Sequence, residues 1–330
     1  MARRRREGEP DRAGVLLVDK DLGPTSHDVV QDVRRAAGQR RVGHTGTLDP
    51  AATGVLVACL GRATKLVPFL QQAGTKTYAA RMVLGVETTS QDAQGEVVAR
   101  TPAGHVDERT FCEVLTRFVG DLDQVPPMVS AVRVGGERLH EIARRGEVVE
   151  REPRRVTVHD LILDGYGGSD PDHPEASFLV TCSAGTYVRT LAHDVGAALG
   201  VGGSLTALRR VANGPFTVDE SHTIAAVREA AEQGQLDALL LDPLTAVSRA
   251  LPTVEVTDDD LVRRLAHGGK LPTSLLEPAL GSGYQGPVAV RSGQLLVGVY
   301  APSGAESRAE LVWTRPEELG PAPDSRPEDV

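Results

Sequence analysis

The chain has 330 residues, of which 40% are hydrophobic and 25% charged, and its net charge is −9. This composition excludes a disordered or fibrous protein, and the apolar runs are far shorter than the roughly 20 residues that span a membrane. The acidic balance does not exclude an RNA partner. Residues 1–80 carry 13 Lys and Arg against 8 Asp and Glu, and local potential is what steers a phosphate backbone.

The two ends and the cysteines indicate where the protein works. The basic N-terminus has no hydrophobic stretch behind it, so we expect no secretory signal. The cysteines are odd in number and far apart, which predicts reduced core thiols in the cytoplasm: Cys59, Cys112 and Cys182. Residues 1–13 and 315–330 are predicted to be disordered, as a basic and an acidic tail. The basic tail is either a solvated segment or an arm that touches RNA.

Strands and helices are both predicted along the first 245 residues. A buried strand is expected over 14–20, and then a helix over 28–37, capped by Thr25 or Ser26 and closed by Gly38. Further strands are predicted at 77–84, 96–99, 129–134, 156–163 and 177–183. Further helices are predicted at 61–72, 107–118, 190–199 and 224–241. Residues 85–95 and 165–174 are expected to be loops, and the charged segment 137–155 an exposed helix and hairpin.

A boundary is predicted between Pro243 and Pro252. Beyond it, short strands are expected at 253–256, 288–290, 295–300 and 309–313, with one helix over 258–266. This pattern predicts a small β-rich module over residues 250–314.

The stretch RVGHTGTLDPAATGVL, residues 41–56, holds one aspartate on a glycine-rich loop. Pro50 pushes Asp49 towards an extended conformation on a defined turn. Residues 55–60 form a buried strand or the start of a buried helix. Three glycines permit backbone conformations and close approaches that a Cβ would block: Gly43, Gly46 and Gly54. The stretch is either an active site or an ordinary turn in which Asp49 is a cap.

Six separated segments match one pattern, and the first three are GVLLVDKDLGPTSHDVV, RVGHTGTLDPAATGVLVACLGRATKL and GTKTYAARMVLG. The others are VPPMVSAVRVGGERLHEIARRG, CSAGTYVRTLAHDVGAALG and SLTALRRVANGPF. With these segments, which span residues 14–216, the chain resembles the TruB family of tRNA pseudouridine synthases, which isomerise uridine 55 of the T-loop. The long GHTGTLDPxATGVL motif makes a chance match implausible and favours an active site at Asp49.

The resemblance implies an α+β fold, with a mixed, mainly antiparallel sheet and the cleft across its middle. It implies a catalytic domain over 14–245, with an insertion at 126–155 that folds over the T-loop, and a PUA-like RNA-binding module. It also implies a monomer that acts on the T-arm of tRNA, with other T-loop-like hairpins as further substrates, and no cofactor or metal. The residues agree with the last point, since no cysteine–histidine cluster, P-loop or dinucleotide fingerprint is found.

The resemblance also implies catalytic roles. Asp49 is the carboxylate beside the sugar, and either attacks a carbon or removes a C2′ proton to leave a glycal. Arg189 is expected to hold it ionised through two parallel hydrogen bonds. Tyr78 stacks on the flipped base, and Tyr187 is the general base at C5 or its relay. Each tyrosine could instead be a core aromatic.

RNA contacts are carried over in the same way. His44 fills the space that the flipped base leaves, unless it is a buried structural histidine, and Leu208 walls the uracil pocket. Lys20 supports the loop near Asp49. Phosphate contacts, or else solvated surface charges, are Lys65, Arg144 and Arg145. Gly43 and Asp92 complete the residues expected at the RNA.

Two other functions remain compatible with these residues. One is a tRNA-folding chaperone that binds and opens the T-loop, with catalysis secondary. The other is a related enzyme aimed at T-loop-like hairpins in other RNAs. The C-terminal module leaves its own RNA contacts open, since residues 251–330 carry seven Lys and Arg against twelve Asp and Glu.

Overall fold

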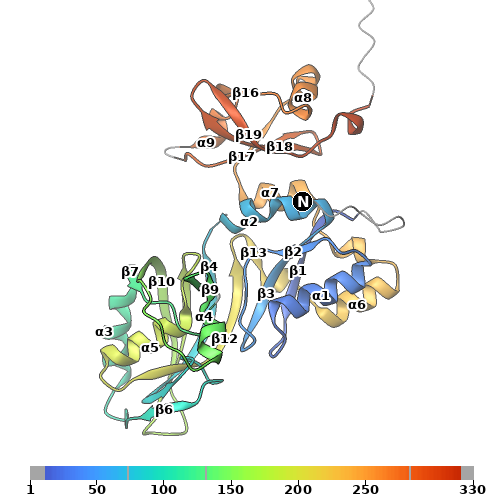
Figure 1. The fold of residues 1–330 in the computed structure, drawn as a ribbon. Helices are drawn as coiled ribbons and strands as arrows, with labels where there is room; N and C mark the ends of the chain where they lie inside the picture. The colour runs from blue at the N-terminus through green and yellow to red at the C-terminus, as the bar shows by residue number, and fades with distance from the viewer. Residues whose placement is uncertain (1–11, 73, 131, 282–283, 321–330) are drawn as a thin grey trace, which may run out of the picture.

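The computed structural model describes residues 12–320 apart from 73, 131, 282 and 283. Most of the two predicted tails therefore lies outside the described residues. A larger part, built on one long sheet, carries a smaller C-terminal module on top, and α2 (Val67–Gln72) and α7 (Pro243–Ala250) lie where the two meet (Figure 1). Within the described residues no helix is long and apolar enough to cross a membrane.

In the described part of the chain, ten strands form the large sheet, in the order β14-β1-β3-β12-β4-β11-β10-β7, with β2 on β3 and β13 on β12. Most neighbours are antiparallel, while β1 pairs with β14 and β12 with β3 in parallel. The strands are β1 (Gly14–Lys20), β2 (Val42–His44), β3 (Ala52–Leu60), β4 (Lys76–Leu84), β7 (Gly120–Gln124), β10 (Arg154–Gly167), β11 (Glu175–Cys182), β12 (Gly203–Asn213), β13 (Phe216–Thr217) and β14 (His222–Thr223). This mixed, mainly antiparallel sheet confirms the predicted fold class.

Strands β1 and β3 are almost continuously apolar because both of their faces are covered. Alternate residues point to opposite sides. Leu16 and Leu56 pack with α1 (Ser26–Ala37) and α6 (Ile224–Glu232), whereas Val15 and Val57 pack with α7 and with the 3₁₀ turn η1 (Gly61–Leu66). The other half of the sheet is covered by α3 (Glu108–Leu115) and α5 (Val188–Ala198).

Helix α1 begins two residues before the predicted start and ends where the sequence predicts. Thr25 and Asp28 form a capping box at its start, and Gly38 ends it in the left-handed conformation at φ 62°. The predicted helix at 224–241 is interrupted: α6 ends at Glu232 and a short 3₁₀ turn follows, Leu236–Leu239. Gly234, at φ 71°, lies at the break.

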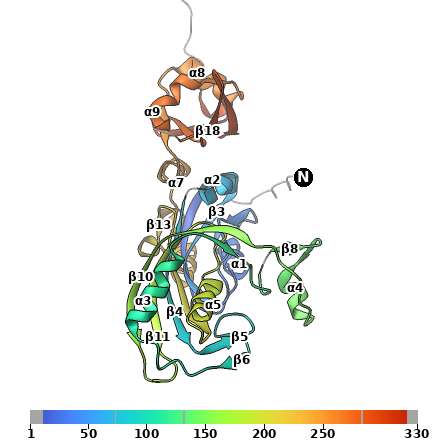
Figure 2. The same ribbon diagram turned by 90° about the vertical axis from the view of Figure 1, so that its left-hand side faces the viewer.

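Several other boundaries differ from the prediction. Residues 85–95 are not a continuous loop, since β5 (Val86–Thr88) pairs with β6 (Val97–Arg100). The edge strand β7 was missed, and β10 extends to Gly167, into the predicted turn. Within the predicted strand at 129–134, only β8 (Arg133–Val134) forms. It pairs with β9 (Glu137–Arg138), and α4 (Leu139–Arg144) follows; together they project from the body of the molecule (Figure 2).

The C-terminal module has a five-stranded sheet in the order β15-β17-β18-β19-β16. These strands are β15 (Thr253–Glu255), β16 (Leu271–Pro272), β17 (Val288–Ser292), β18 (Leu295–Ser303) and β19 (Glu306–Val312), beside α8 (Asp259–Ala266) and α9 (Glu277–Leu280). The C-terminal module and the larger part share a hydrophobic cluster, in which Trp313 joins Leu66 and Val247. The guanidinium of Arg62 lies 4.7 Å from the centre of the Trp313 ring and pairs with Glu318 at 2.8 Å.

Of the three cysteines predicted to be core thiols, two are buried. Cys59 and Cys182 are buried, whereas Cys112 is only partly buried. Burial raises the pKa of the Cys59 thiol to about 12 and that of Cys182 to about 11. Both side chains are therefore protonated packing groups at neutral pH.

Candidate active site

The loop between β2 and β3, residues 45–51, carries Asp49 and is anchored to helix α1. Ser26 is buried in the first turn of α1. Its hydroxyl donates to the carbonyl of Leu48 at 3.0 Å and accepts from the amide of Leu48 at 2.8 Å. The residue before Asp49 is thus held by both of its backbone polar groups.

A second anchor is Arg210 on β12, which is fully buried. Its guanidinium donates to three carbonyl oxygens, those of Val55 at 2.9 Å, Gly46 at 3.1 Å and Thr47 at 3.3 Å. These groups lie on both sides of Asp49 in the chain, so Arg210 closes the loop over the strand. The sequence reading missed this role. No local pattern marks it, because the role depends on the parallel pairing of β12 with β3.

Gly43 on β2 and Gly54 on β3, on either side of the loop, differ in whether their positions tolerate a side chain. Gly54 has φ 104°, and a Cβ there would lie 2.2 Å from the carbonyl oxygen of Arg210, so its lack of a side chain is essential. For Gly43 the expectation was wrong. Its backbone has no positive φ, and a Cβ would meet only ordinary contacts at 3.8 and 3.9 Å.

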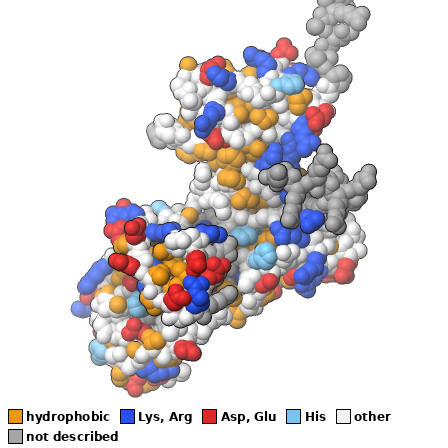
Figure 3. Space-filling view, in the orientation of Figure 1, with side chains coloured by type: hydrophobic (Ala, Val, Ile, Leu, Met, Phe, Trp, Pro, Cys, Tyr) orange, Lys and Arg blue, Asp and Glu red, His pale blue; other side chains and the backbone are white. Residues whose placement is uncertain are grey.

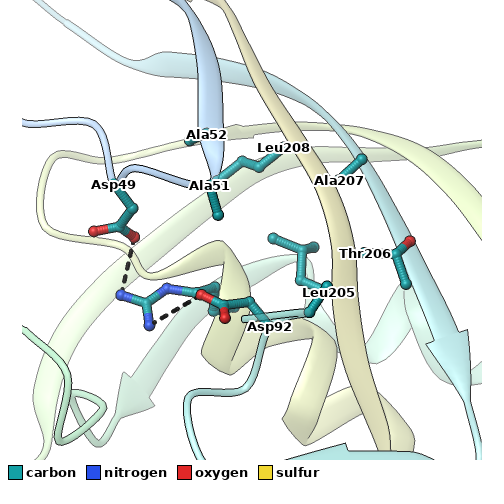
Figure 4. A pocket seen from close by; sticks show the side chains of 10 residues that line it. Asp49, Ala51, Ala52, Asp92, Leu205, Thr206, Ala207 and Leu208 are labelled. Atoms are coloured by element: carbon teal, nitrogen blue, oxygen red, sulfur yellow. Dashed lines mark ion pairs between the residues drawn. The ribbon is translucent and has the colours of Figure 1, made fainter. Parts of the chain in front are cut away.

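Asp49 and Arg189 meet at the edge of a cleft, as the sequence predicts (Figure 4). Arg189 Nη2 lies 2.9 Å from Asp49 Oδ2, and Arg189 Nη1 lies 3.5 Å from Asp92 Oδ2. Arg189 also donates to the carbonyls of Ser90 at 2.9 Å and Val129 at 3.0 Å. The expected pair of parallel hydrogen bonds is therefore wrong: one guanidinium is shared between two carboxylates and two carbonyls.

Exposure separates the members of this group. The side chain of Asp49 is 42% exposed, while that of Arg189 is 5% and that of Asp92 is 9% exposed. Asp92 is further fixed by the hydroxyl of Ser90 at 2.5 Å and by the amide of Gln94 at 3.0 Å. The arrangement therefore presents one carboxylate to a ligand and keeps the arginine and the other carboxylate behind it.

The cleft beside this group is narrow and largely apolar. Strand β12 forms one wall and the start of β3 another (Figure 4). The lining residues are Asp49, Ala51, Ala52, Asp92, Ala93, Arg189, Leu205, Thr206, Ala207 and Leu208. Leu208 is thus on the wall. A flat, mostly apolar ring could be enclosed here with its polar edge next to a carboxylate.

Neither predicted tyrosine lines this cleft. Tyr78 on β4 is buried, with its hydroxyl near the guanidinium of Arg210. Burial raises the pKa of Tyr78, and the positive charge of Arg210 counteracts part of that rise. Tyr187 is partly buried at the start of α5. The structure fixes its backbone, whose amide donates to the side chain of Gln124 at 2.7 Å and whose carbonyl accepts from it at 3.0 Å.

Lys20 and His44 flank the Asp49 loop. Lys20 is buried and donates to the carbonyl of Asp21 at 2.9 Å; burial lowers the pKa of its ammonium, and Asp49 partly offsets this. Nδ1 of His44 accepts from the amide of Gly46 at 3.2 Å. Burial and the nearby Arg210 lower the pKa of the His44 ring, so it is neutral at pH 7.

The three predicted phosphate contacts differ. Lys65 is exposed, and its pKa is lowered first by partial burial and then by three arginines, Arg62, Arg41 and Arg315. Lys and Arg side chains gather where the C-terminal module meets the larger part (Figure 3). Arg145 pairs at 2.7 Å with both Glu137 and Glu147, which offsets its charge. The side chain of Arg144 lies outside the described part of the structure.

Among the described residues, no group of three or more His, Cys, Asp or Glu side chains could hold a metal ion. The described cleft presents to a ligand a carboxylate that is paired with a guanidinium. Such a group can act as a nucleophile or as a base.

Family models and relatives identify this arrangement. The model for the N-terminal domain of TruB family pseudouridylate synthases matches residues 34–188, and that for the C-terminal domain of tRNA pseudouridylate synthase B matches 189–248. The tRNA pseudouridine synthase B of Thermobifida fusca (strain YX) is 45% identical over 296 residues, 88% of this chain and 92% of that protein. Its namesake in Symbiobacterium thermophilum is 48% identical over 270 residues, 81% of this chain and 86% of that protein.

Solved structures agree over most of the chain. A chain in the crystal structure of a Cbf5-Nop10-Gar1 complex matches with a TM-score of 0.69 and 26% identity, covering 93% of this chain and 86% of that one. A chain in an H/ACA RNP bound to a substrate RNA containing 2′-deoxyuridine matches with a TM-score of 0.67 and 25% identity, covering 93% and 87%. The fold and the cleft are those of a pseudouridine synthase. Within that class, the chain belongs to the TruB family of tRNA pseudouridine synthases.

Proposed function

We propose that the protein converts uridine 55 in the T-loop of tRNA to pseudouridine, as a monomer in the cytoplasm. The observation that carries this proposal is the Asp49–Arg189 pair at 2.9 Å on the rim of the apolar cleft. Membership of the TruB family supports the substrate, and its relatives carry the name tRNA pseudouridine synthase B. The C-terminal module, as a PUA-like domain, would add contacts to the same RNA.

The chemistry breaks the N1–C1′ bond of the uridine and forms a C5–C1′ bond. The proton on C5 leaves, and N1 of the product carries one, so no oxidant, reductant or energy source is consumed. Asp49 supplies the carboxylate beside the sugar, either as a nucleophile or by removing the C2′ proton. Arg189, which is itself paired with Asp92, holds that carboxylate in place from behind.

The target base must leave the folded T-loop to reach the cleft, which costs unstacking energy. Leu208 would contact the flipped base, Tyr78 would stack on it, and His44 would fill the space that it leaves. Tyr187 would take the C5 proton, directly or through a relay. Phosphate contacts would come from the exposed Lys65 and from the projecting segment around α4, which carries Arg144.

Asp49→Asn tests the proposal, because an amide keeps the shape of the side chain and removes its charge. Incubated with a T-arm hairpin labelled with tritium at C5 of the target uridine, the variant should release no tritium while it binds the hairpin with unchanged affinity. Asp32→Asn is the control, since Asp32 pairs with Arg228 at 2.8 Å on the far helices α1 and α6. Tritium release by Asp49→Asn at the wild-type rate would refute the assignment.

The same measurement separates catalysis from a chaperone function. An enzyme loses its benefit to tRNA with Asp49→Asn, whereas a chaperone keeps it because binding persists. The refolding yield of a misfolded tRNA transcript, measured with both proteins, decides between them. An equal yield would favour the chaperone. Sequencing of modified uridines in RNA from a deletion strain would give the full set of substrates.

A further inference from the structure

Lys76, the first residue of β4, is a partly buried cation beside the Asp49 loop. Its backbone is paired in the sheet with Cys182 and Asn213. Within the described part of the chain, its ammonium makes no hydrogen bond or ion pair, while its carbonyl accepts from the thiol of Cys182 at 3.7 Å. A charge that has lost water normally has a partner of opposite charge.

Two cations converge on one point of the loop. A Cβ built on Gly46 would lie 3.3 Å from Nζ of Lys76 and 3.8 Å from Nη1 of Arg210. The amide of the same glycine donates to His44 at 3.2 Å. Gly46 is three residues from Asp49, which bounds their separation at about 10 Å.

Neutral groups surround the second cation. Arg210 donates to the carbonyls of Gly46, Thr47 and Val55, and the hydroxyl of Tyr78 lies near it. These acceptors satisfy its donors and leave its charge uncompensated. Burial and the charge of Arg210 lower the pKa of Lys76, which is the response of a cation that has lost water without gaining an anion.

The charges that face Lys76 come from several elements. Arg210 lies on β12, His44 on β2 and Cys182 on β11, and none of these is an anion at neutral pH. The carboxylate of Asp49 is paired with Arg189 and not with Lys76. An anion placed next to Lys76 would therefore gain from two positive charges in a partly dehydrated setting.

We propose that Lys76, with Arg210 behind it and Gly46 and His44 beside it, is a binding site for a phosphodiester group of the substrate RNA, next to the flipped nucleotide. The site rests on the proposed function for the nature of its ligand. The phosphates of a nucleotide whose sugar contacts Asp49 would lie within the same distance of Asp49 as Gly46 does, which is about 10 Å at most. Binding of that phosphate would fix the sugar against the carboxylate without reading the sequence.

The experiment measures equilibrium binding in the Asp49→Asn background, so that no turnover occurs. T-arm hairpins carry a single uncharged methylphosphonate linkage, on the 5′ or on the 3′ side of the target uridine, or none. Each is titrated against the protein with Lys76 intact and with Lys76→Gln. Lys270→Gln is the control, because Lys270 is an exposed lysine of the C-terminal module that pairs with Glu306.

With Lys76 intact, one of the two linkages should weaken binding about tenfold. With Lys76→Gln, the unmodified hairpin should bind about tenfold more weakly, and that linkage should cost nothing further. The slope of log Kd against log salt should fall by about 1, as expected for one lost phosphate contact. Lys270→Gln should keep the dependence on the linkage.

Equal losses for every linkage with and without Lys76 would overturn the site, as would an unchanged salt slope. Lys76→Arg covers the case in which the glutamine variant fails to fold: it keeps the charge and must keep the dependence on the linkage. If the hairpin binds tightly but no linkage matters, the site fails and the proposed function stands. If no hairpin binds, both fail.

Discussion

The guanidinium of Arg189 contacts the carboxylate of Asp49 through a single interaction of 2.9 Å, from Nη2 to Oδ2. Its remaining contacts go to Asp92 at 3.5 Å and to the carbonyls of Ser90 and Val129. Arg189 therefore ties the catalytic loop to the segment before Asp92 and to the start of the 126–155 insertion. A residue with one point of charge could replace only one of these links.

Arg189→Lys should lower the single-turnover rate at least about 100-fold, which corresponds to about 2.7 kcal/mol of transition-state stabilisation. The lysine ammonium cannot span the carboxylate and both carbonyls at once. Rapid-quench measurement of pseudouridine at saturating enzyme would test this. Arg155→Lys, at an exposed arginine that lies 3.4 Å from Asp123, should stay close to the wild-type rate. A rate for Arg189→Lys within threefold of wild type would contradict the shared-guanidinium geometry.

Arg210→Met should lower the free energy of unfolding by about 3 kcal/mol, because one buried and two partly buried carbonyls lose their donor at about 1 kcal/mol or more each. Arg209→Met is the matched control on the neighbouring residue of the same strand. Arg209 is partly exposed and pairs with Asp19 at 2.8 Å, so its loss should cost about 1 kcal/mol or less. Urea unfolding gives both values, and equal losses would show that Arg210 does not hold the loop.

Gly54→Ala and Gly43→Ala should differ sharply. At Gly54 the alanine would meet the Arg210 carbonyl at 2.2 Å and adopt φ 104°, so the variant should lose on the order of 3 kcal/mol or more, or fail to fold. At Gly43 the added methyl group meets only ordinary contacts, and the change should stay within about 1 kcal/mol. Thermal unfolding followed by circular dichroism compares them. A Gly54→Ala protein as stable as Gly43→Ala would argue against this loop conformation.

His44 should make stability fall with acid. Burial lowers the pKa of His44 below its ordinary 6.5, so below that pH the unfolded chain binds a proton that the folded protein does not. The free energy of unfolding therefore decreases as pH drops through 6.5. His44→Gln lacks this term, and the stability difference between wild type and variant should shift in favour of the variant between pH 7.5 and 5.5. Urea titrations at both pH values would reveal it, and a constant difference would contradict it.

The sequence predicted the parts of the site that lie in local patterns. The Asp49 loop, the apolar strands beside it and the capped helix α1 each follow from residues close together in the chain. The loop role of Arg210 does not, because it depends on the parallel pairing of β12 with β3, which places Arg210 opposite Gly54. Parallel partners far apart in the chain leave no mark on either segment alone.

Two other features that the sequence did not predict also have physical explanations. The edge strand β7, with the sequence GDLDQ, has one neighbour and mostly solvated side chains, so it carries little of the apolar pattern that marks a strand. The ion pairs of Arg145 with Glu137 and Glu147 depend on the fold of the hairpin before α4. At Arg145, the sequence therefore indicated more free positive charge than the folded segment presents.

The hydrophobic cluster that joins Trp313 to Leu66 and Val247 bears on the distance between the C-terminal module and the cleft. Because apolar side chains from both parts pack together, and Arg62 lies over the Trp313 ring and pairs with Glu318, these contacts would have to break for the C-terminal module to rotate relative to the cleft. The folded protein therefore sets the distance between the cleft and the C-terminal module. An RNA substrate that contacts both must have a stem of matching length.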